Sequence, residues 1–85
     1  MRIRKEKRFL EDFAALPPSI QKRAKKQLAL FLQNPRHPSL QTKKMEGWRD
    51  IWEGRITDDY RFTFKIEGDL YKLRRIGPHD IERNP

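Results

Sequence analysis

The chain has 85 residues, a length that favours one domain spanning residues 1–85. It has no cysteine, which excludes disulfides and thiolate chemistry. Its net charge of +8 predicts attraction to polyanions such as nucleic acid, an acidic protein segment or an anionic membrane. Charged residues make up 38% of the chain, but two Trp, two Tyr and five Phe in periodic segments favour a folded domain over disorder.

The first half of the chain predicts a strand and a helical hairpin. Residues 2–5 alternate and are expected to form an edge strand. A helix is predicted next, because Phe9, Leu10, Phe13 and Leu16 recur at helical spacing and form one apolar face. Pro17-Pro18 ends it, and a second helix follows, capped by Ser19 or beginning at Pro18 and ending at Asn34-Pro35. Its apolar stripe consists of Ile20, Ala24, Leu28, Phe31 and Leu32.

The basic residues beside that stripe are also typical of a helix on a membrane surface, but the sheet predicted after it offers the stripe a partner within the domain. No apolar run approaches the ~20 residues of a membrane span. The charged start of the chain lacks the apolar core of a signal peptide. We therefore expect a cytoplasmic protein without a membrane partner.

The second half changes to the alternating pattern of strands. Residues 36–47 are expected to form a loop, and strands are predicted at 48–56, 60–66 and 70–76, with a tail at 77–85. The resulting order β-α-α-β-β-β predicts an α+β domain, in which the N-terminal strand and helical hairpin accompany a small antiparallel sheet and the helices cover one face.

Strand alternation separates an apolar face from a basic face. The residues expected to face the helices are Trp52, Ile56, Tyr60, Phe62, Phe64, Ile66, Tyr71 and Leu73. Turns at 57–59 and between Ile66 and Asp69 set the pairing, with Arg55 opposite Arg61. The other face, expected to be open, carries Arg49, Glu53, Arg55, Arg61, Lys65, Lys72 and Arg74. Because like charges opposite each other are destabilising, this face indicates a phosphate site, unless Glu53 neutralises the arginines as a structural ion pair.

Four segments together resemble the RelE/ParE superfamily of bacterial type II toxins, over nearly the whole chain. They are LEDFAALPPSIQKRAKKQLALFLQNP (10–35), LQTKKMEG (40–47), WEGRITDDYRFTF (52–64) and RRIGPHD (74–80). The resemblance implies the RelE-like fold and a toxin neutralised by an antitoxin encoded beside it. RelE-like members cleave mRNA in the ribosomal A site without a metal, whereas ParE-like members poison DNA gyrase.

The GPHD ending resembles the RelE- and YafQ-type branch, in which a His just after this Gly belongs to the active site, the position of His79. Many such toxins have a Tyr or Phe four residues later that stacks on a nucleobase. Here that residue is Arg83, whose guanidinium can also stack on a base.

RNA cleavage by internal transfer needs a base, cations beside the phosphorane and an acid. Arg55 and Arg61 suit the cationic role, and His79 and Glu53 suit proton transfer. Residues expected to bind RNA or phosphate are Lys43, Lys44, Arg49, Lys65, Lys72, Arg74 and Arg83. Two alternatives stay open: that His79 is an ordinary surface residue of a turn, and that Lys43 and Lys44 belong to a solvated loop. Two distant His and no Cys make a metal site improbable, and no cofactor is expected.

The sequence therefore predicts a toxin of a type II toxin-antitoxin module, an endoribonuclease acting on mRNA at the ribosome. Its expected partners are a cognate antitoxin, mRNA, the ribosome and, through the antitoxin, operator DNA. Two alternatives remain open: a ParE-like inhibitor of DNA gyrase without nuclease activity, and an inactive basic binding domain.

Overall fold

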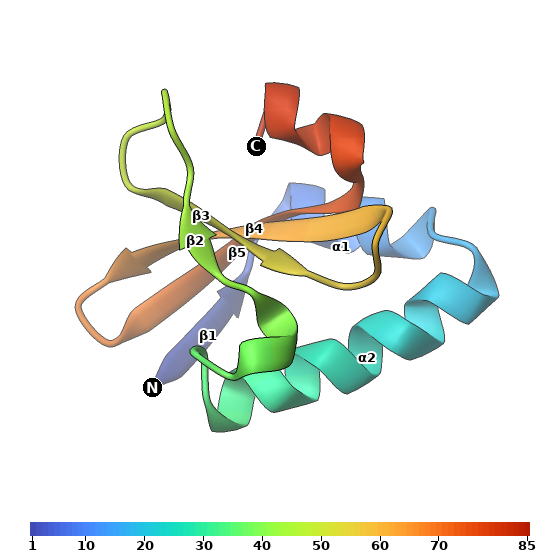
Figure 1. Cartoon of the computed structure of the whole chain (residues 1–85), viewed down its shortest axis with the longest axis horizontal. Coiled ribbons are helices and arrows are strands. Elements are labelled where there is room, and N and C mark those ends of the chain that lie inside the picture. Colours follow the sequence, from blue (N-terminus) through green and yellow to red (C-terminus); the bar gives the residue numbers. More distant parts are fainter.

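Five strands form one sheet, in the order β1-β5-β4-β3-β2, in a computed structural model that describes all of residues 1–85 (Figure 1). The strands are β1 (Arg2–Lys5), β2 (Lys43–Lys44), β3 (Ile51–Arg55), β4 (Tyr60–Glu67) and β5 (Leu70–Pro78). The helices are α1 (Lys7–Ala14) and α2 (Pro18–Gln33), with short 3₁₀ helices η1 (Pro38–Leu40) and η2 (His79–Arg83). The predicted α+β class is confirmed, and no helix is both long and apolar enough to cross a membrane.

The sheet is mixed rather than purely antiparallel. β1 runs parallel to β5, whereas β2 through β5 pair antiparallel. A parallel pairing needs a long connection between its two strands, and here both helices and strands β2 to β4 lie between β1 and β5 in the chain. β2 lies within the segment expected to be a loop, and Lys43 pairs with Glu53 across the ladder.

The boundary between the two helices agrees with the sequence pattern, since α1 ends before Pro17 and α2 begins at Pro18. Pro18 is the first residue of α2 and Pro17 takes the cap position without a side-chain hydrogen bond, so Ser19 is not the cap. Proline suits the first helical position because its missing N–H would have no partner there and its φ is already helical. The strand predicted at 48–56 starts late, at Ile51, because Gly47 and Asp50 adopt positive φ angles of 79° and 58°.

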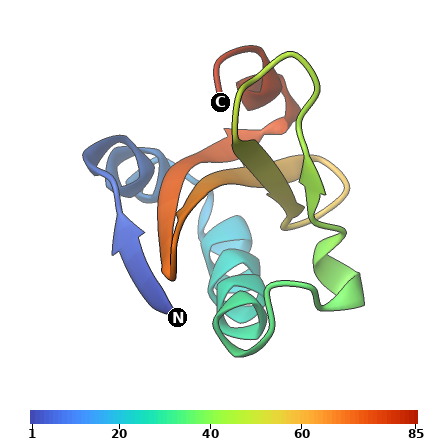
Figure 2. The ribbon, with the colours of Figure 1, turned by 90° about the vertical axis from the view of Figure 1, so that its left-hand side faces the viewer.

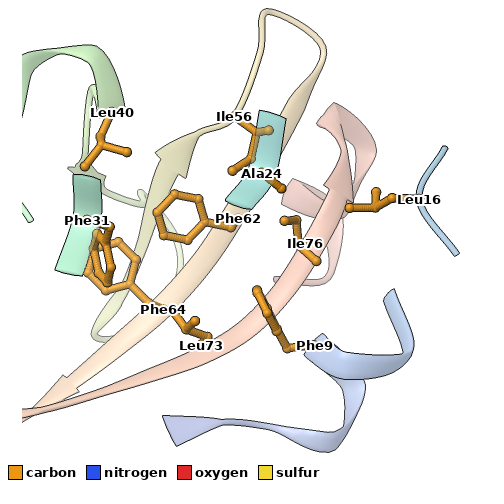
Figure 3. Close-up of a cluster of buried hydrophobic side chains, with 10 residues drawn as sticks. All are labelled: Phe9, Leu16, Ala24, Phe31, Leu40, Ile56, Phe62, Phe64, Leu73 and Ile76. Carbon is orange, nitrogen blue, oxygen red and sulfur yellow. The ribbon is translucent and has the colours of Figure 1, made fainter. Parts of the chain in front are cut away.

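The core lies between α2, α1 and one face of the sheet (Figure 3). Its ten buried residues are Phe9, Leu16, Ala24, Phe31, Leu40, Ile56, Phe62, Phe64, Leu73 and Ile76. Phe31 of α2 meets the rings of Phe62 and Phe64 edge-on, at centroid distances of 5.2 and 4.8 Å. The predicted apolar face is confirmed, but Leu10 and Leu32 are about half exposed, at 52% and 54%.

The register of the central hairpin is as predicted, with Arg55 opposite Arg61. The next turn lies one residue further along than predicted, at Gly68-Asp69, so that Ile66 pairs with Tyr71, two residues beyond its predicted partner Asp69. Gly68 allows this turn because it adopts a φ of 62°. A pairing shift of two residues leaves Tyr71, Lys72 and Leu73 on their predicted faces.

The second face of the sheet is covered, which corrects the expectation that it is open. Figures 1 and 2 show η2 on the side of the sheet opposite α2. Ile81 of η2 is buried and packs so closely on Gly77 that a Cβ there would lie 2.9 Å from it. Glu53 and Thr63, predicted to face water, are only 3% and 0% exposed. The tail was expected to be irregular, so its covering role was not foreseen.

Candidate functional site

A buried carboxyl group, that of Glu53, lies at the centre of the covered face. Its side chain is 5% exposed, and Oε1 lies 3.4 Å from Nζ of Lys43, the residue paired with it across the β2–β3 ladder. Oε2 is buried and receives no hydrogen bond from any nitrogen or hydroxyl donor. Burial raises the pKa of Glu53, and the nearby carboxylate of Glu82 raises it further, whereas Lys43 opposes the shift. Glu53 is therefore a carboxyl group that tends to hold a proton.

Glu82 joins Glu53 to the predicted catalytic histidine. Its Oε1 lies 2.9 Å from Nε2 of His79, three residues earlier in η2. The hydrogen bond with Glu53 lowers the pKa of Glu82, with His79, Lys43 and Arg61 adding to the effect. The pKa values of this carboxyl pair are thus shifted apart, that of Glu53 upward and that of Glu82 downward, so Glu82 is the first of the two to ionise as pH rises.

Two arginines extend the site along the β3–β4 hairpin. Arg55 forms an ion pair with Asp58 in the turn, and Arg61 donates to the carbonyl oxygens of Thr57 and Tyr60. Each arginine is only partly exposed, and neither bonds to Glu53. The structural ion pair considered for Glu53 is thus made with Lys43 instead.

A hollow of about 170 Å³ brings these groups together. It is lined by Gln41, Lys43, Glu53, Gly54, Arg55 and Arg61. Three cations around one small hollow favour an anion such as a phosphate. Glu53 lies in the same wall, and its raised pKa suits it to the role of proton donor.

A second hollow, of about 340 Å³, lies beside the first and shares Lys43 and Glu53 with it. Its other lining residues are Lys44, Met45, Glu46, Trp48 and Glu82. The indole of Trp48 is among the few large apolar side chains that are exposed, at 39%. An exposed aromatic ring beside lysines is a suitable platform for a stacked base.

Solved structures with the same fold are bacterial and archaeal toxins. YafQ from E. coli strain BL21(DE3) superposes with a TM-score of 0.76 at 16% identity, covering 94% of this chain and 96% of that one. RelE in the RelB-RelE antitoxin-toxin complex from Methanococcus jannaschii gives 0.74 at 24% identity, covering 96% and 99%. A YoeB/ParE toxin from Agrobacterium tumefaciens gives 0.76 at 14% identity, covering 93% and 99%.

The fold is that of the RelE/ParE toxins. The superpositions cover nearly the whole of this chain and of each neighbour, so the similarity extends over the domain. No protein-family model matches the sequence, and no curated protein matches it either. At these identities the similarity shows the architecture, and the chemistry has to be argued from the side chains of this chain.

The RelE/ParE-like fold gathers some of the sequence-predicted site residues. Glu53, Arg55 and Arg61 share a hollow with Lys43, and His79 reaches this group through Glu82. His79 itself is well exposed, at 65%, and its backbone N–H donates to the carbonyl of Asp59 at 2.9 Å. That bond ties the start of η2 to the β3–β4 turn, which also carries the arginine partners.

Other predicted residues lie outside this hollow. Lys65 and Lys72 are paired across β4 and β5, and Lys72 binds Glu67 at 2.9 Å. The remaining four are dispersed: Lys44 and Arg49 lie near Asp50, Arg74 donates to the carbonyl oxygen of Pro85, and Arg83 is exposed in η2. The β-bulge between Thr63 and Phe64 displaces Arg74 from strict alternation.

Glu82 is the site residue that sequence reasoning missed. The available signal was the spacing of His79 and Glu82, since residues three apart lie above one another in a 3₁₀ helix. The signal could be used only if the tail formed a helix, and the tail was expected to be irregular.

Proposed function

We propose that this chain is the toxin of a type II toxin-antitoxin module and acts as an endoribonuclease on mRNA at the ribosome. The proposal rests on one observation: Arg55, Arg61 and Lys43 surround a hollow whose wall holds Glu53, a carboxyl group of raised pKa, and Glu82 links this carboxyl group to His79. The RelE/ParE fold supports it, because toxins with this fold are known in complexes with antitoxins.

Side chains alone can supply the reaction. Neutral His79 takes the proton of a ribose 2′-OH while the 2′-oxygen forms a bond to phosphorus. Arg55 and Arg61 stabilise the added negative charge on the phosphoryl oxygens. The bond from phosphorus to the 5′-oxygen breaks, and Glu53 gives its proton to that oxygen. The products are a 2′,3′-cyclic phosphate and a 5′-hydroxyl, and a proton returning from His79 to Glu53 restores the starting state.

The raised pKa of Glu53 decides its role in this scheme. The sequence suggested Glu53 as a second possible base, but a base must be ionised when substrate arrives. Burial favours the protonated form, which makes Glu53 the acid and leaves His79 as the base.

The helical side of the molecule supports an antitoxin partner. An apolar groove of about 300 Å³ between β1, α1 and α2 is lined mainly by hydrophobic residues, with Lys5 and Lys25 as its only polar members. Residues 1–42 carry ten Lys and Arg against three Asp and Glu, whereas residues 43–85 carry ten against nine. An acidic amphipathic antitoxin segment suits this surface, and through the antitoxin the pair would bind operator DNA.

Induced expression in bacteria tests the nuclease. Wild type is compared with His79→Ala and with His37→Ala, the matched control at the only other histidine. Primer extension of total mRNA within minutes should show new ends inside translated codons for wild type and His37→Ala but not for His79→Ala. Growth arrest with DNA damage and intact mRNA would instead identify a gyrase inhibitor. No arrest would identify an inactive binding domain.

A further inference from the structure

The carboxylate of Glu82 lies between the two groups that exchange protons. On one side its Oε1 is 2.9 Å from Nε2 of His79, and on the other its carboxyl group lies near enough to that of Glu53 to shift the pKa of both groups. Its side chain is 26% exposed, against 65% for that of His79. The mostly buried side chain of Glu82 therefore contacts the exposed imidazole ring of His79.

Charged groups from four elements surround Glu82. They are Glu53 of β3, Lys43 of β2, Arg61 of β4 and His79 of its own turn. Three of these carry or can carry positive charge, and the fourth, Glu53, has a raised pKa and so ionises after Glu82. All four therefore favour an ionised Glu82, which can accept hydrogen bonds and cannot donate them.

An acceptor at Glu82 determines the state of the facing nitrogen. A neutral imidazole carries one proton, and the nitrogen beside an anionic oxygen is the one that keeps it. Nε2 of His79 is that nitrogen, so Nδ1 is left with its lone pair. The same logic applies where a buried carboxylate holds the tautomer of a catalytic histidine.

We propose that Glu82 is a positioning residue that holds neutral His79 in the Nε2–H form and makes Nδ1 the atom that accepts the substrate proton. The identity of the substrate rests on the proposed nuclease function, whereas the form of the ring does not. Glu82 itself takes no proton from the substrate in this scheme.

Nitrogen-15 NMR of the full-length protein tests the form of the ring directly. The spectra of neutral imidazole distinguish a proton on Nδ1 from one on Nε2, and the chain has two histidines. His37 is an internal reference, because its Nδ1 accepts from the backbone N–H of Ser39 at 3.2 Å and its proton must lie on Nε2. In wild type both histidines should show the Nε2–H pattern.

Glu82→Ala should give His79 a mixture of the two forms while His37 is unchanged. Glu82→Gln keeps an acceptor oxygen and should retain more of the Nε2–H form, so it separates loss of the acceptor from loss of the fold. A His79 pattern unchanged in Glu82→Ala, or a wild-type proton on Nδ1, would overturn the proposal.

RNA cleavage supplies the second readout. Glu82→Ala should lower kcat by roughly 10²-fold, the lower range of what a general base contributes, with a smaller change in KM. The kcat of Glu82→Gln should lie between those of wild type and Glu82→Ala. If Glu82→Ala mixes the forms but cleaves at the wild-type rate, Glu82 does not position His79 for the reaction. If wild type cleaves no RNA yet shows the expected forms, the nuclease function fails and the assignment of the ring stands.

Discussion

Arg55 and Arg61 lie directly opposite each other in the β3–β4 ladder, and each guanidinium is held by a different group of the turn that joins the strands. Asp58 neutralises Arg55, while Arg61 binds only neutral carbonyl oxygens, those of Thr57 and Tyr60. The pair is therefore stable without a bound anion, and Arg61 keeps its full charge for one.

Replacing Arg61 by lysine should separate catalysis from stability. Lysine keeps the charge but lacks the planar fork that contacts both the turn and a phosphate. We expect cleavage to fall by roughly 10²-fold, with the free energy of unfolding lowered by about 1 kcal/mol. Cleavage assays and urea unfolding measure the two effects. Arg36→Lys, at an exposed loop position, is the control. Full activity in Arg61→Lys would contradict the assigned role.

Glu53→Gln should change how stability depends on pH. The folded-state pKa of Glu53 is raised above its ordinary 4.5, first by burial. Between the pKa of Glu53 in the unfolded state and its higher pKa in the folded state, the folded state binds more protons. The free energy of unfolding therefore falls as pH rises through this range. Glu53→Gln lacks this loss, so its free energy of unfolding should rise relative to that of wild type as pH increases above about 4.5. The difference between the two proteins should become constant above the folded-state pKa of Glu53.

Urea unfolding at a series of pH values measures the difference between the two proteins. The lowered pKa of Glu82 acts on the other side, since the stability that it contributes is present above its ordinary value of 4.5 and is lost as pH falls through its folded pKa. Glu46→Gln, an exposed neighbour in the second hollow, is the control. Parallel curves for wild type and Glu53→Gln would rule out the raised pKa.

Asp12→Ala should destabilise the fold much more than Asp69→Ala. Asp12 of α1 binds Arg75 at 2.7 Å and also accepts from the backbone N–H of Ile76 at 3.1 Å, with both side chains under 20% exposed. Removing it leaves partly buried donors unpaired, at about 1–3 kcal/mol. The Arg2–Asp69 pair is exposed, and its loss should cost below ~1 kcal/mol. Equal losses in thermal or urea unfolding would contradict this ranking.

Gly54→Ala should be destabilising because the ring of Phe62 occupies the space that a Cβ would take. Forcing a methyl group into a packed core costs about 1–3 kcal/mol. Phe62→Leu shrinks the obstructing side chain, so Gly54→Ala should cost less in that background than in wild type. Urea unfolding of the four proteins gives the coupling free energy. Simple additivity would mean that the two residues do not compete for space.

Lys43 and Lys72 should differ in their contribution to RNA binding. Lys43 lines both hollows, whereas Lys72 is held by Glu67 away from them. Lys43→Ala should weaken single-stranded RNA binding at every sequence and reduce the slope of log affinity against log salt by about 0.7. Lys72→Ala should leave both nearly unchanged. Equal effects would show that RNA tracks along β4 and β5 instead.

The sequence determined both α-helices, four of the five strands and the apolar face of the sheet. Period-two alternation in β4 placed Phe62 and Phe64 toward the helices, and a turn of three residues put Arg55 opposite Arg61. These are local relationships, in which neighbouring residues in the chain decide the outcome. The observed turn at Gly68-Asp69 differs from the predicted one, but Tyr71 and Leu73 still face the core, because a pairing shift of two residues preserves the faces of a strand.

The state of the second face was decided only by tertiary structure. Nothing in the spacing of the last nine residues shows that Ile81 packs on Gly77 or that Glu82 meets Glu53, which lies 29 positions earlier. Such contacts depend on the path of the chain after β5, and only they remove Glu53 from water. The sequence therefore identified which groups could exchange protons, whereas burial by the C-terminal turn raises the pKa of Glu53, because desolvation disfavours its charged form.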